Sequence, residues 1–316
     1  MIQINDLKIH YGELVAVDRL SLKVSKGSIY GLIGPNGAGK STTIKAIATL
    51  LQPTFGEILV DGIPVLHEPE NARKILGYMP DSPPVYDDLK VDEFCDLFAH
   101  AYGLSPGERI EKINKCLQLT DLTEKRKDLC KNLSRGMKQR VLLAKTLVHD
   151  PSVLLLDEPT ANLDPKARIN FRNLLHRLAS EGKTILVSSH ILSEMEDLCD
   201  AIGIMRKGSM ILSGPVNEII NHSNSKRIIQ IELAHECPEI LTLLKNLPKT
   251  SNLKSSDQSN RKFALTHHGN SEEVAQSLSS LVLKKVPICG FHFKQSKVED
   301  LFLEVEADKE LKEPAR

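Results

Sequence analysis

The sequence carries no net charge, no paired cysteines and no long apolar run, and each absence excludes a class of protein. Its 41 basic and 41 acidic residues cancel, which gives no support for broad nucleic-acid binding. No run of about 18 apolar residues occurs, so the sequence predicts no membrane-spanning helix, and any role at a membrane must come through a partner. The first residues alternate between apolar and polar side chains, which indicates a strand and not a signal peptide.

The six cysteines show neither a C-x-x-C pair nor the spacing of a metal site. Cys95 and Cys199 fall in apolar helical patterns, where a free thiol packs as a small hydrophobic side chain. This usage is typical of a reducing cytosol. The length of 316 residues allows a sizeable core and predicts two domains.

A glycine-rich stretch at residues 34–41 matches the phosphate-binding pattern G-x-x-x-x-G-K-[ST]. Glycines let successive backbone N–H groups point into one concavity, which suits a phosphate chain. Lys40 adds a positive charge for the β- and γ-phosphates, and Ser41 offers a hydroxyl to Mg²⁺. We expect a strand at 28–33 and a helix at 41–51, which places the phosphates at a helix N-terminus. The residues expected to hold the nucleotide here are Gly34, Pro35, Asn36, Gly37, Ala38, Gly39, Lys40, Ser41 and Thr42.

The apolar pattern predicts a parallel α/β core with additions. Residues 1–33 alternate as half-buried antiparallel strands, and the continuous apolar runs at 153–157 and 184–188 are typical of central parallel strands. Helical spacing dominates residues 88–133, which we expect to form a helical insert. The alternation of strand and helix therefore predicts an α/β domain over residues 1–220.

A polar linker is expected at residues 221–225, followed by a small α+β domain over 226–316. The helix predicted last opens with a capping box at 296–299 and has one apolar face. No group of residues in this domain suggests chemistry. The predicted elements are strands at 228–233, 262–266 and 287–294 and helices at 238–247, 272–283 and 298–306.

Two carboxylates and a histidine follow the predicted parallel strands. Asp157 and Glu158 end the run at 153–157, where Asp157 can hold Mg²⁺ and Glu158 can accept a proton from an attacking water. His190 follows the strand at 184–188 behind two serines, a place that favours function. Ser134 and Gly136 open a further helix, which could meet a phosphate, or Ser134 could be an ordinary N-cap.

The order of these motifs resembles the nucleotide-binding subunit of an ABC transporter, over about residues 1–220. Residues 34–41 match its Walker A loop, 133–137 its signature, 153–158 its Walker B strand with the catalytic glutamate, and 161–164 its D-loop. His190 takes the place of the switch histidine. Tyr11 takes the place of an aromatic that stacks on adenine, although it could equally be a core or edge tyrosine.

The sequence departs from that family pattern at two points. Asp81 replaces the glutamine that senses Mg²⁺ and the membrane subunit; a carboxylate can still reach a metal through water, but it adds a negative charge. The signature contains Arg135 and Met137, while Ser134 and Gly136 are kept. Both departures, and residues 298–303, resemble the branch that includes many bacterial drug, antibiotic and lipid exporters.

The resemblance implies a P-loop NTPase fold with an antiparallel β subdomain and a subunit that hydrolyses ATP to power a membrane transporter of the exporter type. It implies ATP and Mg²⁺ as cofactors, an integral membrane permease as partner, and a head-to-tail homodimer at the cytoplasmic face of the membrane, with no nucleic acid bound. Two alternatives stay open: a soluble ABC-type ATPase acting in translation, DNA repair or cluster assembly, and a regulatory or scaffolding subunit with little turnover. The implied site residues are Glu158 and His190 for catalysis, Ser41, Asp81 and Asp157 for the metal, and Tyr11, residues 34–42, Ser134 and Gly136 for the nucleotide.

Overall fold

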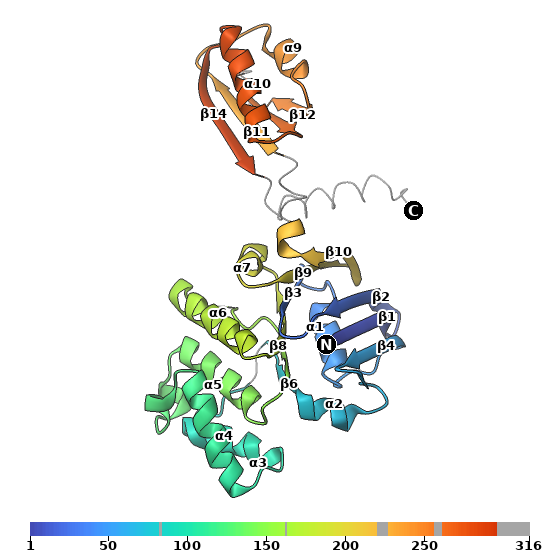
Figure 1. Ribbon diagram of the computed structural model, residues 1–316, viewed down its shortest axis with the longest axis vertical. Coiled ribbons are helices and arrows are strands. Elements are labelled where there is room, and N and C mark those ends of the chain that lie inside the picture. The colour runs from blue at the N-terminus through green and yellow to red at the C-terminus, as the bar shows by residue number, and fades with distance from the viewer. Residues whose placement is uncertain (82–83, 162, 220–226, 256–260, 296–316) are drawn as a thin grey trace. The chain divides into compact units, whose positions relative to one another are not determined.

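The chain forms two compact units, Met1–Val216 and Asn217–Arg316 (Figure 1). The structure is a computed structural model that describes residues 1–81, 84–161, 163–219, 227–255 and 261–295. Three predicted features lie outside the described residues: the linker at 221–225, Asn162 of the D-loop, and the helix at 298–306 with its capping box.

The first unit combines two sheets with helices. Its strands are β1 (Ile2–Tyr11), β2 (Leu14–Val24), β3 (Ile29–Ile33), β4 (Phe55–Val60), β5 (Ile63–Pro64), β6 (Leu76–Met79), β7 (Val153–Leu156), β8 (Thr184–Ser189), β9 (Ala201–Arg206) and β10 (Ser209–Pro215). Its helices are α1 (Lys40–Ile47), α2 (Pro69–Ile75), α3 (Val91–Ala101), α4 (Pro106–Leu119), α5 (Arg135–Leu147), α6 (Pro165–Ser180) and α7 (Leu192–Glu196), with 3₁₀ turns at Thr123–Lys125 and Cys130–Asn132.

The six-stranded sheet has the order β10-β9-β3-β8-β7-β6. Its strands run parallel except β10, which pairs antiparallel with β9. Strands β3, β7 and β8 are buried along their whole length, as expected for strands covered on both faces. The predicted parallel α/β core is therefore confirmed. The apolar pattern did not predict β6, β9 or β10. Strand β6 is short and contains a glycine, and β10 is half exposed.

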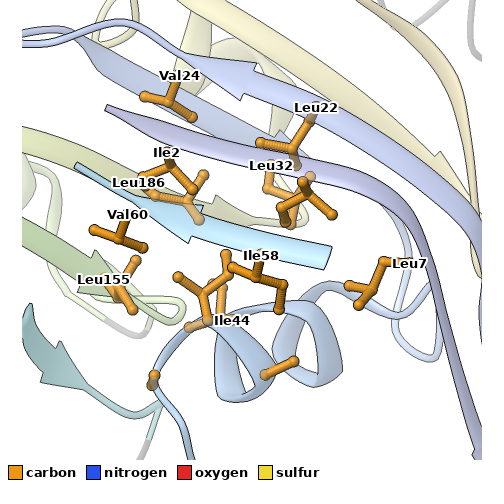
Figure 2. Close-up of a cluster of buried hydrophobic side chains, with 14 of the residues drawn as sticks. Ile2, Leu7, Leu22, Val24, Leu32, Ile44, Ile58, Val60, Leu155 and Leu186 are labelled. Carbon is orange, nitrogen blue, oxygen red and sulfur yellow. The ribbon is translucent and has the colours of Figure 1, made fainter. Parts of the chain in front are cut away.

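The four-stranded sheet β2-β1-β4-β5 is antiparallel, as predicted for its first strands. Its apolar side chains pack against helix α1 and the parallel sheet in one hydrophobic core. Figure 2 shows Ile44 of α1 among Ile2, Ile58 and Leu155, which come from three different strands. Each of these side chains is at most 1% exposed. Burying such a side chain contributes roughly 1.5–3 kcal/mol, so this core fixes α1 and the loop that precedes it.

Helix α1 is shorter than predicted, since it ends at Ile47 and not at Leu51. Thr49 takes a left-handed backbone conformation with φ 63°, which ends the helix. The amide of Leu50 then closes the end by donating to the carbonyl of Lys45 at 2.9 Å. In the sequence the apolar spacing continues past this point, because Leu51 still packs against the core after the helix has ended.

The predicted helical insert contains α3, α4 and the two 3₁₀ turns. Helix α4 begins at the expected capping box, in which the Glu108 carboxylate accepts from the amide and the hydroxyl of Ser105. In the described part of the chain, no helix is long and apolar enough to cross a membrane.

The second unit has strands β11 (Arg227–Leu233), β12 (Thr250–Ser255), β13 (Lys262–His267) and β14 (Ile288–Gln295) and helices α9 (Ile240–Lys245) and α10 (Ser271–Leu283). The sheet order β12-β13-β11-β14, with antiparallel neighbours, gives the β-α-β-β-α-β arrangement of a ferredoxin-like fold. The expected α+β architecture is thus confirmed, but β12 was missed. This strand lies at the sheet edge and has Leu253 as its only strongly apolar residue, so its sequence shows no alternation.

Candidate active site

The phosphate loop runs from the end of β3 to the start of α1 and lies tightly against neighbouring backbone. A Cβ atom added to Gly34 would lie 2.3 Å from the carbonyl oxygen of Met205, and one added to Gly39 would lie 2.6 Å from that of Ala16. Gly39 also has φ 101°, a conformation that side-chain-bearing residues rarely adopt. The loop can therefore keep this shape only with glycine at both positions.

A pocket of about 300 Å³ opens over this loop. Tyr11 lies at one wall and is about half exposed, so it is not a core tyrosine. Leu14, Val15 and Ala16 extend this apolar wall. Their sequence pattern did not predict them as site residues. The pocket is lined by Tyr11, Leu14, Val15, Ala16, Asn36, Gly37, Ala38, Gly39, Lys40, Ser41, Thr42, Asp81 and Glu158. Apolar surface on one wall and a phosphate loop on another suit a nucleotide.

Lys40 is 5% exposed, and its ammonium group is held by the loop itself. Its Nζ atom donates to the carbonyl of Gly34 at 2.7 Å and to that of Pro35 at 3.2 Å. It also lies 3.5 Å from Oε1 of Glu158, a carboxylate that is 14% exposed. The positive charge at the pocket is thus paired with the carboxylate of Glu158.

Ser41 and Asp157 meet beside the pocket, where the hydroxyl of Ser41 donates to Oδ1 of Asp157 at 3.0 Å. The hydroxyl of Ser188 donates to the same oxygen at 2.6 Å and accepts from the amide of Glu158 at 2.9 Å. A hydroxyl and a carboxylate are the hard oxygen donors that Mg²⁺ prefers, so these residues fit that ion together with phosphate oxygens. Ser188 is one of the two serines that precede His190, and its sequence pattern predicted no role, because its contacts depend on the pairing of β7 with β8.

Glu158 has a left-handed backbone with φ 48° and lies directly before a proline. Its carboxylate contacts two basic side chains, those of Lys40 and His190. Oε1 faces Lys40, and Oε2 lies 2.9 Å from Nδ1 of His190, which is 48% exposed. Because a carboxylate can only accept, Nδ1 of His190 carries the hydrogen in this contact.

Asp81 lies in the loop after β6 and lines the pocket, and its side chain is exposed. Tyr78, at the end of the same strand, is half-buried. Burial, with smaller contributions from Asp157 and Asp81, raises the pKa of Tyr78 to about 12. This phenol therefore stays protonated and neutral beside the carboxylates.

Ser134 and Gly136 lie at the start of α5 and do not line this pocket. Ser134 is the N-cap of the helix, since its hydroxyl accepts from the amide of Met137 at 3.3 Å. The same helix is tied to the segment after Glu158, because Gln139 donates to the carbonyl of Pro159 at 2.6 Å. Within one chain, these two residues are therefore separate from this pocket.

Comparison with known proteins gives matches over most of the chain. The family model described as ABC transporter matches residues 17–161, and one described as AAA domain, putative AbiEii toxin, Type IV TA system, matches residues 130–196. The linearmycin resistance ATP-binding protein LnrL of Bacillus subtilis is 31% identical over 305 residues, which are 96% of this chain and 97% of that protein. The Nod factor export ATP-binding protein I of Cupriavidus metallidurans is 34% identical and covers 73% of this chain and 76% of its own length. A solved structure titled as the dimeric structure of MJ0796, a bacterial ABC transporter cassette, is 27% identical with a TM-score of 0.61, over 68% of this chain and 99% of that chain.

Proposed function

The chain belongs to the ABC transporter family of ATP-binding subunits, which hydrolyse ATP, and from this premise we propose which of its residues do the work. One observation carries the proposal. Three stretches far apart in the sequence supply Lys40 and Ser41, Asp157 and Glu158, and His190. Ser41 contacts Asp157, and Glu158 contacts Lys40 and His190. Ser188 joins these two sets into one network beside the pocket.

ATP binds with its phosphates on the loop of residues 34–42 and its adenine against Tyr11. The loop amides and the N-terminus of α1 favour the negative phosphates. Lys40 neutralises charge at the β- and γ-phosphates, since its ammonium group already lies at the loop. Tyr11 lines the same pocket and is about half exposed, so its ring can stack on a base.

Hydrolysis uses Glu158 as the base that takes a proton from the attacking water. His190 holds the Glu158 carboxylate through Oε2 and contacts the γ-phosphate. Ser41 and Asp157, with Asp81 acting through water, would hold Mg²⁺, which neutralises charge on the phosphoryl oxygens. Such chemistry depends on placing charges correctly, and the contacts among these residues supply that placement.

A second copy completes the site in a head-to-tail homodimer. Ser134 and Gly136 are too far from the pocket of their own chain to line it, yet they present a helix N-terminus that suits phosphate. A related cassette has been solved as a dimer. ATP would then lie between the loop of one chain and Ser134 of its partner.

The dimer drives an integral membrane permease from the cytoplasmic face of the membrane, in the direction of export. The support is the naming of relatives for resistance and export. The permease contacts the chain near Asp81, at the edge of the pocket. The soluble-ATPase alternative has no comparable support among these relatives. The second unit, whose ferredoxin-like fold holds no catalytic residue that we assign, is an accessory domain for dimer contacts or regulation.

Two experiments test these proposals. Lys40→Ala should weaken ATP binding by at least about tenfold, while Lys45→Ala, an exposed lysine of the same helix, should leave it unchanged. Equal affinity in both variants removes Lys40 from the site. Pull-down of the chain from solubilised native membranes should recover an integral membrane protein. Recovery of soluble factors alone would contradict the transporter proposal but not the ATPase.

A further inference from the structure

We propose that Ser188 is a positioning residue for ATP hydrolysis, with one hydroxyl that fixes both the metal-holding carboxylate and the backbone of the base. This inference rests on the roles proposed above for Asp157 and Glu158. Neither the family resemblance nor the phosphate-loop pattern selects this residue.

The geometry of the hydroxyl is specific. Ser188 is completely buried near the end of β8, in a strand that pairs in parallel with β7 up to Leu156. Its Oγ atom donates to Oδ1 of Asp157 at 2.6 Å and accepts from the amide of Glu158 at 2.9 Å. The hydroxyl therefore gives its hydrogen to Asp157 and accepts from Glu158, the next residue in the chain.

Both contacts constrain groups that would otherwise be free to turn. Oδ1 of Asp157 also accepts from Ser41. Two hydroxyls from distant parts of the sequence therefore orient the carboxylate. Glu158 has φ 48°, a costly conformation that persists only where neighbouring contacts hold it. The hydrogen bond from its amide to Ser188 is such a contact, and it fixes the backbone from which the Glu158 side chain extends.

Groups that orient a metal-binding side chain typically affect metal affinity or activity by about 10- to 100-fold. A hydroxyl that only satisfies buried polar atoms would instead affect stability. Ser189 provides the comparison within the same strand. It is 1% exposed, and its hydroxyl accepts from the amide of Ile191 at 3.0 Å. That bond reaches neither Asp157 nor Glu158.

The test measures Mn²⁺ binding to the ADP-loaded full chain by electron paramagnetic resonance, alongside kcat at saturating Mg²⁺ and the affinity for ADP without metal. Ser188→Ala should weaken Mn²⁺ binding by about tenfold or more and lower kcat by a similar factor. Affinity for metal-free ADP should stay within about twofold, since the loop contacts are untouched. Ser189→Ala should match the wild type in all three measurements.

A matched pair keeps the test valid if Ser188→Ala folds poorly. Ser188→Thr and Ser188→Val have the same shape and differ only in the hydroxyl. The threonine variant should bind Mn²⁺ at least about tenfold more tightly than the valine variant. Equal binding by these two variants, or an equal loss in Ser189→Ala, overturns the role of Ser188. Failure of the wild-type chain itself to bind Mn²⁺ with ADP overturns the proposed metal site, and the role of Ser188 with it.

Discussion

Replacing Glu158 by glutamine should tighten ATP binding and stop turnover. Oε1 of Glu158 lies 3.5 Å from Nζ of Lys40, and the two side chains are 14% and 5% exposed. At an effective dielectric constant of about 20, two unit charges at this distance attract by roughly 5 kcal/mol before desolvation is counted. Desolvation offsets most of that attraction in buried pairs, which leaves a net pairing on the order of 1 kcal/mol.

ATP must take Lys40 from this pairing, so the pairing weakens ATP binding by the same amount. Glutamine keeps the shape of the side chain but removes its charge, and we expect ATP affinity to rise about fivefold. The amide cannot accept a proton from water, so kcat should fall by about 10²- to 10⁴-fold. The two effects together distinguish loss of a base from general damage to the site.

The measurement is a fluorescent-nucleotide titration combined with a phosphate-release assay. Glu181→Gln serves as control, because Glu181 is exposed at the end of α6, outside the pocket lining. Wild-type turnover in Glu158→Gln would remove Glu158 from the role of base. Weaker ATP binding in that variant would refute the pairing argument, whatever happened to turnover.

Three other predictions follow from single contacts. Gly34→Ala should abolish nucleotide binding in a titration while the second unit keeps its fold, because the added Cβ would lie 2.3 Å from the carbonyl of Met205; binding like the wild type would contradict the loop geometry. Tyr11→Ala should lower ATP affinity by about fivefold and Tyr11→Phe by less than about twofold, since both Tyr and Phe present a ring; equal losses would argue against stacking. Burial is the largest cause that lowers the pKa of His149 in the folded chain, so the unfolded chain takes up a proton first as the pH falls below about 6.5, and the free energy of unfolding should decrease from about pH 7 to pH 5. Urea titrations should show a smaller decrease in His149→Gln, and an unchanged slope would remove His149 as its source.

The phosphate loop and the parallel core could be predicted from sequence because both depend on local pattern. The run Val153–Leu156 is apolar throughout since both faces of β7 are covered. Local pattern fails where tertiary contacts decide the outcome. Strand β12 has an almost wholly polar sequence and exists because β13 offers it a free edge. Helix α1 ends at Ile47, before the left-handed Thr49, although the apolar spacing continues.

The site shows the same division between local and tertiary information. The residue types of Lys40, Asp157 and Glu158 announce phosphate and metal chemistry, but the contact between Ser41 and Asp157 joins positions 116 residues apart. Ser188 looks like any buried strand serine until the register of β7 with β8 places it beside the Asp157 carboxylate and the Glu158 amide. The sequence signal that was available is the pair Ser188-Ser189 before His190, and only the structure separates their roles.

The contacts of Glu158 bear on how hydrolysis is kept dependent on the nucleotide. With Lys40 at 3.5 Å on one oxygen and His190 at 2.9 Å on the other, both oxygens of the carboxylate are engaged. The ammonium group of Lys40 lies against Oε1, one of the two oxygens that could take the proton from water. Phosphates that draw Lys40 away would free this oxygen, while His190 keeps the other one oriented. Lys40, which we propose to bind ATP, and Glu158, which we propose to activate water, therefore share one ion pair, and ATP binding is the event that would alter it.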